Sequence, residues 1–129
     1  MRKSLNFMSA QIAFILALSV GGCASDPRFS GPIQLLSNAQ IVVVRATARQ
    51  KPEEIVVGGD VRRTNGFAGV VPGHLEVVGR NASGKIVAST TASWGEFMSR
   101  RFHSAYFTAV LLTPDASTIT SIRIEPVTP

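Results

Sequence analysis

Short runs of apolar residues alternate with polar residues and turn signals through most of this chain. Alternation with a period of two is typical of a strand with one buried face, and no run keeps the longer period of an amphipathic helix. The pattern predicts six strands, and a shorter apolar run adds a seventh. The six are Ile41–Ala48, Ile55–Arg62, His74–Arg80, Lys85–Trp94, Ala105–Leu112 and Ile119–Glu125, and the seventh is Ile33–Leu36.

The same alternation predicts which side chains face the core. Gly58 and Gly59 interrupt one run, which indicates a bulge or a close approach of another backbone. Ala105–Leu112 is apolar on both faces, so we expect it at the centre of a sheet. The predicted inward residues are Leu75 and Val77; Ile86, Ala88, Thr90, Ala92 and Trp94; and Ile122 and Ile124. Two further strands have a shared face that is not assigned to the core: Val42, Val44, Ala46 and Ala48 in one, and Ile55, Val57, Gly59 and Val61 in the other.

Turn signals separate these strands, and the clearest is Asn81-Ala82-Ser83-Gly84, where Gly84 can take a positive φ. Short strands at regular spacing predict an all-β, antiparallel sandwich of about seven strands, similar in size to an immunoglobulin domain. The hairpin over residues 73–87 resembles one found in small bacterial immunoglobulin-like or transthyretin-like domains. That resemblance covers few residues and bears on the fold alone.

The start of the chain has the layout of a secretory signal peptide. Arg2 and Lys3 make it positive, and residues 12–20 form a short apolar middle before Gly21 and Gly22. Crossing a bilayer takes about 20 apolar residues, and polar or glycine residues interrupt this segment before it reaches that length. We therefore expect residues 1–22 to be removed as a signal peptide.

Residues 18–23 read LSVGGC, which places Cys23, the only cysteine, directly after the apolar segment. This string resembles the lipobox of bacterial lipoproteins, in which the peptidase cuts before the cysteine and lipid is attached to its thiol. The resemblance implies a lipidated Cys23 and a periplasmic domain. Ala24 stands where the family's inner-membrane retention signal has an aspartate, so the resemblance implies the outer membrane.

The remaining residues are predicted to form a tether and one domain. Residues 23–38 are rich in Ser, Pro and Gly and suit a tether, whereas residues 39–129 hold most of the strands. Cleavage leaves 107 of the 129 residues, which is enough for one domain with its own core. Without Arg2 and Lys3, 11 basic residues face 8 acidic ones. This modest excess does not indicate nucleic acid as a partner.

No constellation of residues points to catalysis or to a cofactor. The chain has no Gly-x-Ser-x-Gly elbow and no glycine-rich phosphate loop before a helix, so we expect no enzyme activity. A metal site needs three or four converging ligands. His74, His103 and Met98 form the one candidate set, for copper, and this is the alternative function.

Two arginine pairs are the candidate partner-binding residues. Arg62-Arg63 and Arg100-Arg101 each precede a phenylalanine in a predicted loop. If both loops lie at one end of the sandwich, they form a basic patch with aromatic tips that suits an anionic envelope component or a protein partner. The chain is therefore expected to be a non-catalytic, lipid-anchored accessory or interaction subunit of a cell-envelope assembly.

Overall fold

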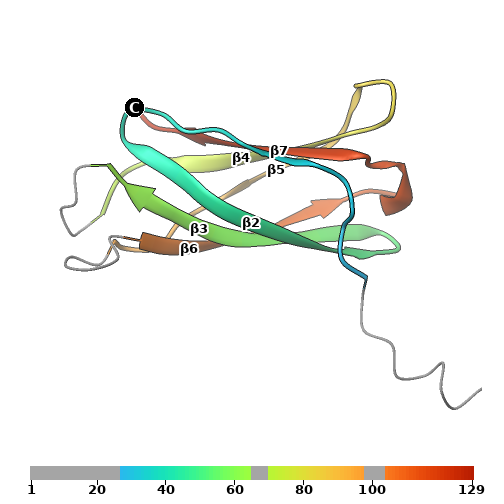
Figure 1. Cartoon of the computed structure of the whole chain (residues 1–129), viewed down its shortest axis with the longest axis horizontal. Coiled ribbons are helices and arrows are strands. Elements are labelled where there is room, and N and C mark those ends of the chain that lie inside the picture. Colours follow the sequence, from blue (N-terminus) through green and yellow to red (C-terminus); the bar gives the residue numbers. More distant parts are fainter. Residues whose placement is uncertain (1–26, 65–69, 98–103) are drawn as a thin grey trace, which may run out of the picture.

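The computed structural model describes residues 27–64, 70–97 and 104–129 (Figure 1). Several predicted features lie outside these ranges, and the predictions about them stay predictions. They are the signal peptide at residues 1–22, Cys23, Met98, Arg100, Arg101 and His103.

Seven strands pack as two sheets, face to face, with the core between them (Figure 1). The four-stranded sheet has the order β1-β7-β4-β5 and the three-stranded sheet the order β2-β3-β6. The predicted all-β sandwich of seven strands is confirmed, although β1 and β7 pair in parallel. The strands are β1 Ile33–Leu35, β2 Ile41–Lys51, β3 Glu54–Arg63, β4 His74–Arg80, β5 Ile86–Ala92, β6 Ser104–Leu112 and β7 Ser121–Val127, with a short 3-10 helix, η2, at Ala116–Thr118.

Alternate residues of both sheets build the core. Leu75 and Val77 of β4 and Ile122 and Ile124 of β7 are buried as predicted, and Ile55, Val57 and Val61 of β3 share one buried face. Burying an aliphatic side chain of this size stabilises the fold by about 1.5–3 kcal/mol before entropy is counted. The other large side chains that are almost fully buried are Phe97, Ile41, Leu111, Ile122 and Ile124.

Trp94 closes one end of this core, as its position in the predicted strand indicated. Its indole N–H donates to the Val71 carbonyl oxygen at 3.0 Å, and its ring centroid lies 6.4 Å from that of Phe97. A buried indole needs such an acceptor, because an unpaired N–H in the core is costly. The hydrogen bond therefore ties the chain after β5 to the segment that leads into β4.

The predicted shared face of β2, with Val42 and Val44 on the side of Ala46 and Ala48, is wrong in its first half, because the strand contains a bulge at Val44. Val43 and Arg45 pair with consecutive residues of β3, which leaves Val44 as the extra residue. One extra residue shifts the two-residue alternation by one position. The buried residues of β2 are Ile41, Val43 and Ala48, whereas Val42 is half-buried and Val44 is 47% exposed.

Gly59 makes the close backbone approach that the glycine pair predicted. A Cβ at this position would overlap the carbonyl oxygen of Arg45, the residue next to the bulge. At Gly58 a Cβ would have its nearest neighbour, the Phe107 carbonyl oxygen, at an ordinary 3.7 Å. Glycine is thus required at one position of the pair, where β2 bends toward β3.

A second register shift, between β4 and β5, turns Ile86 away from the core. Consecutive residues of β4 pair with Ala88 and Ile86, so Val87 is the extra residue. Ile86, which the alternation placed inside, is 49% exposed, and Val87 packs against the core instead. As in β2, the error follows from a bulge that the regular alternation does not reveal.

The Asn81–Gly84 turn of this hairpin is confirmed. The Asn81 side-chain oxygen accepts hydrogen bonds from the backbone N–H groups of Ser83 and Lys85, at 3.1 and 3.0 Å. Gly84 has a φ of 85°, which glycine adopts without strain.

The folded body begins earlier than the predicted boundary between tether and domain at residue 39. Phe29 is buried in the core, and its backbone N–H donates to the Ala48 carbonyl oxygen. The Gln50 N–H donates to the Pro27 carbonyl oxygen, and residues 33–35 form β1. Residues 27–38 therefore belong to the sandwich, because one aromatic side chain and a ladder of backbone hydrogen bonds outweigh their Ser, Pro and Gly content.

The expected central position of residues 105–112 is wrong, because within residues 27–64, 70–97 and 104–129 β6 pairs with β3 alone and so lies at the edge of its sheet. Its inward residues, Ala105, Phe107, Ala109 and Leu111, are buried. Its outward residues face solvent although several of them are apolar. Apolar residues on both sides of this strand therefore do not indicate burial of both sides, and the outward ones form an exposed apolar strip.

Candidate functional site

Arg62 and Arg63 close β3 at one end of the sandwich. Arg62 is exposed and pairs in the ladder with Ser104, the first residue of β6, whereas Arg63 is half-buried and pairs with Ile41 of β2. Because β3 ends where β6 begins, the chain leaves β3 and enters β6 at the same end of the sheet. Arg100 and Arg101 precede β6 but lie outside the described residues, so the joint patch of four arginines remains a prediction.

A shallow hollow of about 210 Å³ lies beside Arg63, lined by Ala39, Gln40, Thr64 and Val71. The Thr64 hydroxyl donates to the Ala39 carbonyl oxygen at 2.7 Å, which fixes the rim. Pockets for small molecules are usually about 300–1,000 Å³. The hollow is therefore better suited to receive a side chain or a charged group from a partner surface than to enclose a cofactor.

Asn38 braces this end of the molecule. Its side-chain oxygen accepts from the backbone N–H groups of Gln40 and Ile41, at 2.9 and 2.8 Å. Its side-chain amide donates to the Thr128 hydroxyl at 3.1 Å. The turn before β2 is thereby tied to the end of the chain, and the backbone around the arginines is held before any partner binds.

Positive charge predominates at this end of the three-stranded sheet. Arg45 forms an ion pair with Asp60 at 2.9 Å, and the Arg45 side chain remains 71% exposed. Arg62 and Arg63 add two further cations on the neighbouring strand. Such a cluster attracts anionic groups, and guanidinium groups bind carboxylates or phosphates with paired hydrogen bonds.

His74, the described member of the predicted copper set, lies at the start of β4. It is half-buried beside the outward-facing Glu76. Among the residues that the structure describes, no three His, Cys, Asp or Glu side chains form a metal-binding group. Since Met98 and His103 lie outside the described ranges, the copper set is untested and no observation favours it.

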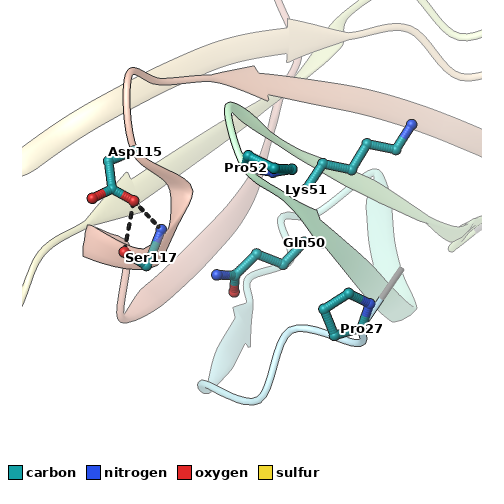
Figure 2. Close-up of a pocket in the computed structure, with 6 residues that line it drawn as sticks. All are labelled: Pro27, Gln50, Lys51, Pro52, Asp115 and Ser117. Atoms are coloured by element: carbon teal, nitrogen blue, oxygen red, sulfur yellow. Dashed lines mark hydrogen bonds between the residues drawn. The ribbon is translucent and has the colours of Figure 1, made fainter. Parts of the chain in front are cut away.

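A second hollow, of about 290 Å³, lies at the opposite end, where the described chain begins at Pro27 (Figure 2). Asp115 caps η2 there: its carboxylate accepts from the Ser117 hydroxyl at 2.6 Å and from the Ser117 N–H at 3.0 Å. These two hydrogen bonds, the side-chain one first, lower the pKa of Asp115 below its ordinary value of 3.8. The carboxylate is thus engaged in holding the turn, and a lowered pKa makes it a poor general acid or base near neutral pH.

One surface was missed by the sequence reasoning, namely the outward side of β6. Tyr106 is 75% exposed, Leu112 71% and Val110 38%. The available signal was the strand sequence itself, SAYFTAVLL, which contains no charged residue, proline or glycine. Apolar residues on both sides were taken to mean burial, whereas they also occur where a surface is covered by another chain.

No protein-family model, curated protein or solved structure matches this chain. The sandwich fold therefore rests on the strands and their pairing. In the described ranges no helix has the length and apolar character needed to span a bilayer.

Proposed function

We propose that this chain is an outer-membrane lipoprotein, anchored through lipid on Cys23, whose periplasmic β-sandwich is a non-catalytic accessory or interaction subunit of a cell-envelope assembly. The lipobox-like string at residues 18–23 supports the anchor. The observation that carries the interaction role is the end of the sandwich bearing Arg62 and Arg63, where positive charge gathers on a braced backbone.

The start of the folded body limits how far the domain can move from such an anchor. Pro27 is already hydrogen-bonded to β2, so only the link from Cys23 to Pro27 is available as a tether. Four residue steps span at most about 14 Å. The sandwich would thus be held close to the lipid surface, with the hollow beside Pro27 at the anchored end.

Arg62 lies at the far end of β3 from this anchor. The strand from Ile55 to Arg62 covers about 23 Å at the usual rise per residue. This separation lets the arginine end meet an acidic protein surface while the anchor stays in the membrane. An acidic partner would form charge-assisted hydrogen bonds there, and bidentate contacts to carboxylates suit the guanidinium group.

The anchor is tested by labelling bacteria that express the full chain with a tagged fatty acid. We expect the label on the wild type and its loss in Cys23→Ser, which keeps the size of the side chain but removes the thiol. When the same cells are fractionated, the wild type should be found in the outer-membrane fraction and the variant outside it. An unlabelled wild-type protein would exclude the lipid anchor.

The interaction role is tested by cross-linking in intact cells and mass spectrometry of the proteins recovered with the chain. We expect one envelope partner in a fixed ratio, and at least a tenfold loss of it in Arg62→Glu. Arg49→Glu is the matched control, because Arg49 is also exposed on the three-stranded sheet but lies near the opposite end. Equal recovery from both variants would exclude the arginine end as the binding surface.

A further inference from the structure

β6 presents a row of backbone groups that no strand of the described chain pairs. The Thr113 N–H donates to the Glu53 carbonyl oxygen, which sets the phase of the β3–β6 ladder. In an antiparallel ladder, alternate residues exchange hydrogen bonds with the partner and the others point to the opposite side. The residues whose N–H and C=O groups point to the open edge are therefore Ser104, Tyr106, Thr108, Val110 and Leu112.

The other sheet edges of the described chain are protected. β2 contains the bulge at Val44 and is covered near its end by residues 27–29, β1 is three residues long, and β5 contains the bulge at Val87. Natural sheets guard edges with bulges, charges, proline, short strands or covering segments, because an open edge pairs with other chains. β6 has nine regular residues and none of these devices.

We propose that β6 pairs with β6 of a second copy of this chain, antiparallel, around a two-fold axis at Thr108. The two three-stranded sheets then join into one continuous sheet. Thr108 lies opposite Thr108 of the partner subunit, Tyr106 opposite Val110 of the partner subunit, and Ser104 opposite Leu112 of the partner subunit. This inference goes beyond the proposed function and does not depend on the lipid anchor.

The strand is complementary to itself in this register. Every residue with outward backbone groups meets another of the same kind, so all of these N–H and C=O groups become hydrogen-bonded. The pair of Tyr106 and Val110 is aromatic against β-branched, a favourable cross-strand combination, and no like charges lie opposite each other. The exposed apolar side chains at Tyr106, Val110 and Leu112 are thereby covered in part.

Charges beyond the strand are compatible with a second copy. Glu54 lies beside Leu112 in the ladder, and Arg62 lies beside Ser104. The antiparallel arrangement brings Glu54 of one copy into the same row as Arg62 of the partner subunit. The two side chains stand three strand spacings apart, about 14 Å, so the pairing sets no like charges against each other and their attraction is weak. Residues 27–29 remain at the outer edges, away from the new interface.

Cross-linking of variants with one added cysteine tests the proposed register. The full chain, including Cys23, is purified in mild detergent. A short thiol cross-linker should join Thr108→Cys into a dimer at least ten times more efficiently than Thr47→Cys. Thr47 is the matched control, because it is a threonine exposed in the same row of the same sheet, on β2. The wild type, which keeps Cys23, measures any background from that residue.

Sedimentation equilibrium of lysine variants tests the interface itself. We expect a dimer whose dissociation constant rises at least tenfold in Thr108→Lys, where two like charges meet on the axis, and does not change in Thr47→Lys. Circular dichroism confirms folding, and Val110→Lys is a second variant if Thr108→Lys unfolds. A monomeric wild type, or a dimer that persists in a folded lysine variant of β6, would overturn the proposal.

Discussion

The two edges of the three-stranded sheet, β2 and β6, differ although both strands are long and bury one face in the same core. β2 carries Arg45, Arg49 and Lys51, contains a bulge, and has residues 27–29 along its side. β6 is uncharged and regular, and no described strand pairs along its outer side. The edge at β2 is thus protected against pairing with another chain, whereas the edge at β6 is open to it.

This difference shows that burial of a face does not decide what happens at an edge. The inward residues of both strands follow ordinary core packing, whereas their edges depend on charge, register and a segment distant in the chain. A difference in charge, register or covering segment between the two edges of one sheet therefore indicates which edge is suited to bind a partner. Substitutions in the segment that covers β2, on the two faces of β6 and at the glycines opposite the bulge test this difference.

Removing the side chain that holds the cover of β2 should have the largest effect. Phe29→Ala is expected to lower the free energy of unfolding by about 3–5 kcal/mol, because it empties a buried aromatic site. Urea denaturation measures the loss, and hydrogen exchange should show faster exchange of the Gln50 amide, which donates to Pro27. Arg28→Ala, at the exposed neighbour, is the control. Equal losses in the two variants would mean that the segment is not held by Phe29.

Truncating the two faces of β6 should give different losses. Leu111→Ala is expected to lower the free energy of unfolding by about 2–5 kcal/mol, because Leu111 is fully buried. Leu112→Ala, next to it but 71% exposed, should change it by about 0.5 kcal/mol or less in the monomer. Urea denaturation at low protein concentration compares them. A large loss in the monomeric Leu112 variant would contradict the orientation of β6 described above.

Adding one methyl group at each glycine of β3 should show the cost of the bulge. Gly59→Ala is expected to destabilise by about 1–3 kcal/mol, because its Cβ overlaps the Arg45 carbonyl oxygen and forces β2 to move. Gly58→Ala has room and should be neutral or stabilising by about 0.4–1 kcal/mol. Thermal unfolding measures the melting temperatures of both variants. Similar melting temperatures of the two variants would show that a Cβ at residue 59 does not clash with the Arg45 carbonyl oxygen.

The smallest effect is expected at the turn that follows β6. Asp115 caps η2, and its pKa is lowered from 3.8 by the Ser117 hydrogen bonds, so its contribution is present above the ordinary pKa and is lost as the pH falls through the folded-state value. Asp115→Ala should melt below the wild type at neutral pH, and this gap should close in acid. Ser117→Ala, which removes one donor, should fall between them. A gap that stays constant with pH would exclude the cap as its cause.

Much of the fold could be predicted because alternation reports local burial directly. β4 and β7 were placed with their correct inward residues, and the Asn81–Gly84 turn follows from a side chain that bonds its own backbone. The faces of β2 and β5 could not be predicted, since a bulge changes the phase through contacts with a partner strand. Of the candidate site, Arg62 and Arg63 were identified by charge, but their shared end with β6 required the pairing of distant strands.

By itself, the sequence determined an all-β chain and its strand positions, because these depend on side-chain types at short spacing. Only the tertiary structure decided that residues 27–38 belong to the sandwich, that β6 is an edge, and that Gly59 must remain glycine. Each of these depends on which segments become neighbours across long stretches of chain. Which segments pair depends on the burial and hydrogen bonding of the whole domain, and a local sequence pattern cannot predict it.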